Sequence, residues 1–122
     1  MAGVVDRKSF GGLLRERRRT AGITQRELAQ RAGVDFSYIS KIENDRIPPP
    51  AADTVVKLCE ILKTPAEELL ARIGKIPSDV QGQLGASAAA QEFLRTVQGL
   101  ALSEEEWRQL ATTVRRFREG SE

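Results

Sequence analysis

Apolar residues recur every three or four positions along most of the chain, the spacing of one face of an α-helix. Four such stretches cover approximately residues 10–21, 52–62, 88–99 and 104–118. In the second of them the apolar set is Val55, Val56, Leu58, Cys59 and Leu62. No long alternation of Val, Ile, Thr and aromatic residues indicates a sheet. We therefore expect an all-α fold.

Helix boundaries can be placed from start and stop signals. Three segments pair a hydroxyl residue with a Glu three positions later, as a capping box requires: Thr24–Glu27, Thr64–Glu67 and Ser103–Glu106. Ser9 and Asp35 are further candidate N-caps, and Gly22, Gly33 and Gly74 supply stops. These signals add short helices over about residues 25–32, 36–43 and 65–73.

Five helices by residue 74 predict one compact domain over residues 9–76. Residues 1–8 are expected to form a flexible leader, and residues 77–87 a linker with a short helical piece from Ser78. Two amphipathic helices joined by residues 99–102 then predict an antiparallel hairpin over residues 88–119.

Several chemistries are disfavoured by composition. The chain has one cysteine, Cys59, and no histidine, so no internal disulfide, His-based metal site or catalytic triad can form. The core spacing of Cys59 favours a small buried residue over a reactive thiol. We expect no enzyme activity and no cofactor. The N-terminal segment lacks the apolar core of a signal peptide, and no run is long enough to span a membrane, which favours a cytoplasmic protein.

Charge is unevenly distributed along the chain, although the net charge is only +2. Residues 1–31 carry eight basic and three acidic side chains, a local charge of +5. Residues 77–122 carry five basic and seven acidic ones, a local charge of −2. This distribution suits a polyanion-binding head joined to a protein-facing tail.

The segment from Thr24 to Asn44 has the residue spacing of two helices that cross at a tight turn. Counted from Gln25, the fifth residue is the small Ala29, the ninth is Gly33, and the tenth, fifteenth and eighteenth are Val34, Ile39 and Ile42. A small residue allows close crossing, glycine allows the unusual backbone of the turn, and the apolar residues dock the second helix on the first. Two core helices of an unrelated bundle are the alternative interpretation.

Residues 10–73 resemble the Cro/C1-type, or XRE-type, helix-turn-helix family of bacterial and phage transcriptional regulators. The resemblance is carried by Leu14-Arg15, Gly22-Ile23-Thr24-Gln25, Glu27-Leu28-Ala29, Ala32-Gly33-Val34, Tyr38-Ile39-Ser40 and Ile42-Glu43-Asn44. It implies a five-helix lambda-repressor-like DNA-binding domain. Two positions depart from the family pattern: Arg17 stands where an apolar residue is common, and Asp45 replaces the usual glycine, which predicts a differently shaped turn.

The resemblance also implies that the helix over residues 36–43 enters the major groove of double-stranded DNA. Phe36, Ser37 and Lys41, flanked by Ser40, are then the candidate base contacts. Lys41 can donate to guanine, Ser37 discriminates poorly, and Phe36 can touch a thymine methyl unless it turns into the core.

Phosphate contacts are expected around the same helix. Gln25 begins its helix and should anchor a phosphate with the free amides there. The other candidates are Arg26, Arg46, Arg15 and Tyr38, the last of which is equally suited to packing. Arg18 and Glu43 match the positions of a partly buried ion pair in the family, so we expect them to be structural.

A domain of this size reads a half-site, so a palindromic operator and a homodimer are expected. Two apolar stripes in the hairpin exceed what the hairpin can cover by itself, and they are the candidate interface: Phe93, Leu94 and Val97; Trp107, Leu110, Val114 and Phe117. Folding of the hairpin onto its own domain is the alternative.

The sequence therefore predicts a dimeric DNA-binding regulator, and a repressor in particular, because blocking a promoter needs no extra surface. Two other hypotheses remain open. The tail could neutralise a partner protein, as in an antitoxin, with DNA binding serving autoregulation. The chain could also be an adaptor that has lost DNA binding.

Overall fold

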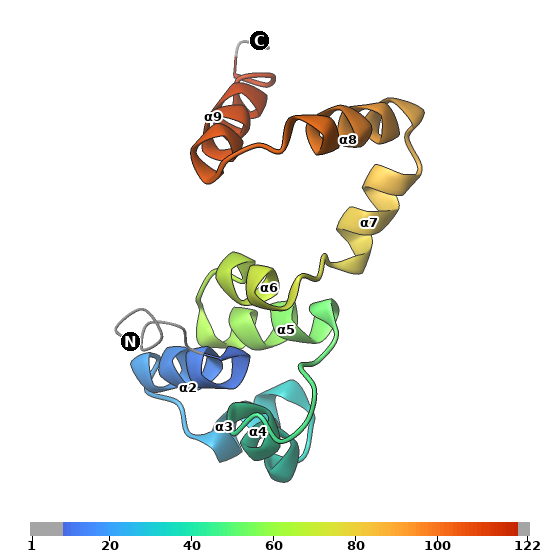
Figure 1. The fold of residues 1–122 in the computed structure, drawn as a ribbon. Coiled ribbons are helices and arrows are strands. Elements are labelled where there is room, and N and C mark those ends of the chain that lie inside the picture. The colour runs from blue at the N-terminus through green and yellow to red at the C-terminus, as the bar shows by residue number, and fades with distance from the viewer. Residues whose placement is uncertain (1–8, 120–122) are drawn as a thin grey trace, which may run out of the picture. The chain divides into compact units, whose positions relative to one another are not determined.

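The computed structural model of the chain describes residues 9–119, and the leader expected over residues 1–8 lies outside this range. All the regular elements of the described part are α-helices, which confirms the all-α class (Figure 1). Their bounds are α2 Phe10–Thr20, α3 Gln25–Ala32, α4 Phe36–Glu43, α5 Ala52–Leu62, α6 Glu67–Ile73, α7 Ser78–Gly85, α8 Ala88–Leu100 and α9 Glu104–Arg115. The chain divides into two units between Gln81 and Gly82.

A single hydrophobic core holds α2 to α6 together, and each of these helices contributes to it. Helix α3 packs on α4 and α5, and α2 packs on α4 and α6. The buried apolar residues are Phe10, Leu13, Leu14, Leu28, Ala29, Ala32, Ile39, Ile42, Ala52, Val55, Leu58, Cys59, Leu62, Leu69 and Leu70. Cys59 is thus a core residue as expected, and burial raises the pKa of its thiol.

Helix α3 begins at the predicted residue but with half of the predicted capping box. The Thr24 hydroxyl accepts a hydrogen bond from the Glu27 amide at 3.0 Å. The Glu27 carboxylate does not return to Thr24, because it accepts from the Arg31 guanidinium at 2.6 Å. At the other end Gly33 has a φ of 73°, the left-handed conformation that glycine adopts at low cost.

Two other predicted caps are wrong. Asp35 occupies the N-cap position of α4 but makes no capping hydrogen bond with its side chain. Helix α6 begins at Glu67 after Ala66, so Thr64 does not cap it. The Thr64 hydroxyl accepts instead from the Arg17 guanidinium at 3.0 Å, and Arg17 also pairs with Glu68. Arg17, unusual for the resembled family, therefore links α2 to the start of α6.

The turn after α4 has the shape that a glycine would allow, in spite of Asp45. This residue has a φ of 57°, so the backbone enters the left-handed region that glycine adopts most easily. Its carboxylate accepts hydrogen bonds from the Ser9 hydroxyl at 2.6 Å and from the Gly11 amide at 3.1 Å. A side chain beyond the end of α4 thereby caps the beginning of α2.

The segment after α6 is attached to α5. The Asp53 carboxylate accepts from the Ser78 amide at 2.9 Å and from the Ser78 hydroxyl at 2.6 Å, and these bonds lower the pKa of Asp53. Lys75 donates to the Pro50 carbonyl at 3.0 Å. The short helical piece expected from Ser78 is confirmed as α7.

Helices α8 and α9 leave their apolar side chains accessible. Ser103 and Glu106 form the complete capping box predicted for α9, with both reciprocal hydrogen bonds present. No residue of either helix is buried, and Trp107 keeps 41% of its surface exposed. The other large exposed apolar residues there are Phe93, Leu94, Leu100 and Val114, and Phe117 is exposed just beyond α9. Within residues 9–119 no helix has the length and hydrophobicity needed to cross a membrane.

Candidate nucleic-acid interface

The two helices of the predicted motif dock through their inward residues. Helix α3 buries Leu28, Ala29 and Ala32, and α4 buries Ile39 and Ile42. Val34, in the turn, packs against the same core. Because these side chains all point inward, the opposite side of α4 remains open to solvent.

The outward side of α4 carries the predicted base-contacting residues. Ser37 and Lys41 are exposed, whereas Ser40 is half-buried. Phe36 is 39% exposed, so its ring does not turn into the core. Tyr38 is half-buried against the core, which fits the packing role weighed for it. Arg46 is exposed just beyond α4, where its amide donates to the Lys41 carbonyl.

A buried carboxylate, that of Glu43, joins α2, α3 and α4. Glu43 is only 2% exposed. Arg18 approaches it at two points, with Nε 2.6 Å from Oε2 and Nη2 2.9 Å from Oε1. Arg18 also donates to the Ile23 carbonyl at 2.9 Å, which ties the same guanidinium to the loop before α3. The ion pair expected between these residues is therefore present and buried.

The Glu43 carboxylate stays ionised because its donors outweigh its burial. Burial alone would raise the pKa of Glu43, since a charge is costly away from water. Hydrogen bonds from Arg18 and Gln25, the charge of Arg18 and a further bond from Arg15 more than offset this and lower the pKa. In the described part of the chain, no buried side-chain polar atom lacks a hydrogen-bond partner.

Two residues expected to contact phosphates are held by this network. Gln25 donates from Nε2 to Glu43 Oε1 at 2.8 Å. Arg15 donates to the Asn44 side chain at 2.6 Å, and its Nε lies 3.5 Å from Glu43. Sequence reasoning did not anticipate these links, because they join residues 18 to 29 positions apart. These hydrogen bonds fix the orientation of the Gln25 and Arg15 side chains.

Arg26 meets Phe36 in a contact that the sequence did not indicate. The guanidinium carbon of Arg26 lies 4.4 Å from the centre of the Phe36 ring, within the range of a cation–π interaction. The two residues lie at the starts of α3 and α4, ten positions apart in the chain. The predicted phosphate contact and the predicted base contact are therefore in contact with each other.

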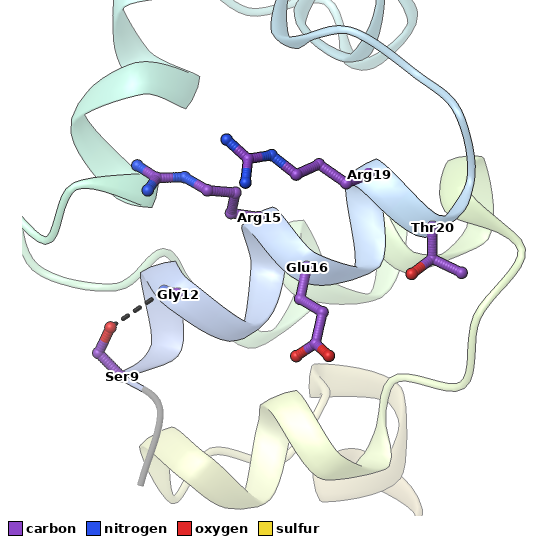
Figure 2. Close-up of a pocket in the computed structure, with 6 residues that line it drawn as sticks. All are labelled: Ser9, Gly12, Arg15, Glu16, Arg19 and Thr20. Atoms are coloured by element: carbon purple, nitrogen blue, oxygen red, sulfur yellow. Dashed lines mark hydrogen bonds between the residues drawn. The ribbon is translucent and has the colours of Figure 1, made fainter. Parts of the chain in front are cut away.

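A basic hollow lies beside this contact, between α2 and the start of α3. Its lining residues are Arg15, Arg18, Arg19, Thr24, Gln25, Arg26 and Phe36. A neighbouring hollow on α2 is lined by Ser9, Gly12, Arg15, Glu16, Arg19 and Thr20, and Figure 2 shows Arg15 and Arg19 extending to the same side of the helix, away from Glu16. Arg19 thus joins the candidate cations, although sequence reasoning left it out.

This arrangement is that of a helix-turn-helix domain. The sequence matches the family described as "Helix-turn-helix domain" over residues 9–72, which is more than half of the chain. The chain therefore belongs to the helix-turn-helix domain family, as the resemblance noted from its motifs implied.

Among its relatives are regulators of Bacillus subtilis strain 168. The uncharacterised HTH-type transcriptional regulator RghRB is 43% identical over 67 residues, covering 55% of this chain and 48% of the relative. The HTH-type transcriptional repressor RghR is 41% identical over 69 residues, covering 57% of this chain and 51% of the relative. This chain thus matches about half the length of these curated relatives.

Among solved structures, the chain is similar to the master regulator for biofilm formation SinR, crystallised in complex with DNA. The two are 31% identical, with a TM-score of 0.47, and the match covers 50% of this chain and 97% of that one.

Proposed function

We propose that this protein is a sequence-specific transcriptional regulator that binds double-stranded DNA, acting as a dimeric repressor on a palindromic operator. The observation that carries the proposal is the two-sided character of α4. Its inward side, with Ile39, Ile42 and Glu43, is committed to the scaffold, while Ser37 and Lys41 stand exposed on the other. Such a helix can enter the major groove with its polar side toward the bases.

In this proposal the residues around α4 divide into readers and anchors. Lys41 donates to guanine, and Ser37 and Ser40 contribute hydrogen bonds at neighbouring positions. Arg26, Arg46, Gln25 and Arg15 contact phosphates, with Tyr38 at the edge of the contact. The Glu43 network supports this division, because Gln25 and Arg15 are held in place before DNA arrives. Anchors that need no reordering lose less entropy on binding.

The exposed apolar residues of α8 and α9 support the dimer. Phe93, Leu94, Trp107, Val114 and Phe117 remain accessible within one chain, and Val97 and Leu110 are half-buried beside them. A symmetric pairing of two copies would cover both stripes and place two copies of α4 on successive half-sites. Repression then follows from occupancy of a promoter alone. In this proposal the protein works in the cytoplasm, where its operator lies.

A second candidate function rests on the same exposed stripes. They also fit a different protein, in which case the tail neutralises or senses a partner and DNA binding is autoregulatory. Mass measurement separates the two. A pure chain that dimerises supports the first function, and a pure chain that stays monomeric and gains mass only with a partner supports the second.

Selection of bound sequences from a random duplex library tests the proposal as a whole. We expect enrichment of one motif repeated as a palindrome, with half-sites about one helical turn or a multiple of it apart. Recovery of unenriched sequence would contradict specific readout, and recovery of single half-sites would contradict dimeric binding.

The tail is tested separately by light scattering of a Trp107→Ala, Leu110→Ala double variant. The expected result is a mass half that of the unaltered chain. Arg108→Ala is the matched control, because it changes an exposed polar residue between the two on α9. An unaltered mass in the double variant would contradict the assigned interface.

A further inference from the structure

Phe36 and Arg26 form one structural unit across the starts of two helices. The ring of Phe36, the first residue of α4, has the Arg26 guanidinium carbon 4.4 Å from its centre. A phenyl ring that is 39% exposed gains only part of the stabilisation of full burial. The negative face of the ring also attracts a cation placed over it, which adds a second favourable interaction at this position.

Arg26 is available to bind an anion while it rests on the ring. Its neighbour Glu27 is occupied by Arg31 at 2.6 Å, and across residues 9–119 no ion pair to a carboxylate is found for Arg26. A guanidinium held over an aromatic ring by its charge still has N–H groups that can donate to a phosphate. Arg26 also lines the basic hollow with Arg19 and Thr24, at the N-terminal end of α3.

We infer that Phe36 is a positioning residue for Arg26 and not a reader of bases. Its ring holds the guanidinium against the basic hollow, in the orientation that binds a DNA backbone phosphate. This inference rests on the proposed DNA-binding function and replaces the base contact predicted for Phe36. Its consequence is that Phe36 sets affinity for all duplexes alike and leaves the base preference to Ser37 and Lys41.

Substitutions at Phe36 distinguish a ring that supports a cation from a side chain that touches a thymine methyl. Phe36→Tyr keeps the aromatic face, whereas Phe36→Leu keeps apolar bulk without it. We expect Phe36→Tyr to bind like the unaltered chain. Phe36→Leu should weaken binding about two- to five-fold, on the selected duplex and on a random duplex of equal length. A contact with a thymine methyl predicts instead that Phe36→Leu keeps its affinity for the selected duplex. Any change would then be confined to the preference at one base position.

A double-variant cycle with Arg26→Ala tests whether Phe36 acts through Arg26. Arg26→Ala should reduce the slope of log affinity against log salt concentration by about 1, which corresponds to one lost phosphate contact. In the Arg26→Ala background, Phe36→Leu should reduce the affinity no further. Arg46→Ala is the matched control, because no cation–π contact is found for this exposed cation within residues 9–119, and its effect should add to that of Phe36→Leu. Urea unfolding of each variant separates loss of binding from loss of fold.

Several outcomes would overturn the inference. Additive effects of Phe36→Leu and Arg26→Ala would show that the two residues act independently. An altered preference at one base position in Phe36→Leu would make Phe36 a reader after all. In both cases the proposed DNA-binding function would stand. A chain that binds neither the selected nor the random duplex would overturn the function and the inference together.

Discussion

The backbone amide of Gly11 donates a 3.1 Å hydrogen bond to the carboxylate of Asp45, which joins the beginning of α2 to the end of α4. A side chain at position 11 would disrupt this junction. A Cβ there would lie 2.3 Å from the Ile42 carbonyl oxygen and 2.7 Å from that of Glu43. Gly11 is thus the residue that lets the candidate reading helix approach α2 closely.

Gly11→Ala is expected to destabilise the fold strongly. The clash involves backbone atoms, which cannot rotate away, so we expect a loss of about 1–3 kcal/mol in the free energy of unfolding. Urea unfolding measures it. Gly82→Ala is the control, because a Cβ at that helical position meets nothing within 4 Å and alanine is the better helix former. Equal stabilities of the two variants would contradict the close approach.

Arg18→Ala should be among the most destabilising substitutions in the chain. It leaves the buried Glu43 carboxylate with weaker partners, and stranding a buried charge costs about 3–5 kcal/mol. The double variant Arg18→Met, Glu43→Leu should recover much of this loss, because it removes both charges.

The matched control for this pair is the exposed Arg31–Glu27 pair at the same 2.6 Å separation. Arg31→Ala should cost less than about 1 kcal/mol, since water screens that pair. Urea unfolding of all three variants compares them. A loss in Arg18→Ala no larger than in Arg31→Ala would mean that burial does not decide the strength of the pair.

Stability should fall in acid because of Glu43. Its folded pKa lies below the usual value, so its contribution is fully present above the unfolded pKa of about 4.3 and is lost as the pH falls through the folded pKa. In that window the unfolded chain binds the additional proton. Urea unfolding should be measured at a series of pH values. The free energy of unfolding should fall less steeply with acid in Glu43→Gln than in the unaltered chain. The same slope in both proteins would assign the acid sensitivity to other carboxylates, such as Asp53.

Lys41→Ala should relax one base position in the proposed complex. The loss of a donor to guanine is expected to cost about 1–3 kcal/mol on the selected duplex and much less on a random one. Electrophoretic mobility shift or fluorescence anisotropy measures both affinities. Lys57→Ala, an exposed lysine on α5, is the charge-matched control and should weaken both duplexes little and equally. A parallel loss on both duplexes in Lys41→Ala would make Lys41 a phosphate contact.

The helices could be predicted from the sequence because their signals are local. Apolar spacing, the Thr24 and Ser103 hydroxyls and the stop at Gly33 all act within a few residues of each boundary. Two of the failed caps, those of Thr64 and Glu27, share one cause. Each has a backbone amide within three residues that it is expected to cap. In the folded chain Thr64 accepts a hydrogen bond from Arg17 instead, and Glu27 accepts one from Arg31. Local pattern reveals that a hydroxyl or carboxylate can cap, but not which donor reaches it first.

The candidate site was predictable only in outline. The exposure of Ser37 and Lys41 follows from helical spacing once Ile39 and Ile42 are placed inside. The links of Gln25 and Arg15 to Glu43, and of Arg26 to Phe36, depend on how three helices cross. Such contacts between distant positions leave no periodic signal in one sequence.

The separation of the two sides of α4 bears on how such a protein can diverge. Ile39, Ile42 and Glu43 secure the helix to its neighbours, while Ser37 and Lys41 have no part in that attachment. Mutations at the two outward positions can therefore accumulate without loss of the fold, so under the proposed function duplicated copies of the gene would acquire different operators in few steps. The same property makes these two positions the natural place to randomise when the domain is engineered for a new target.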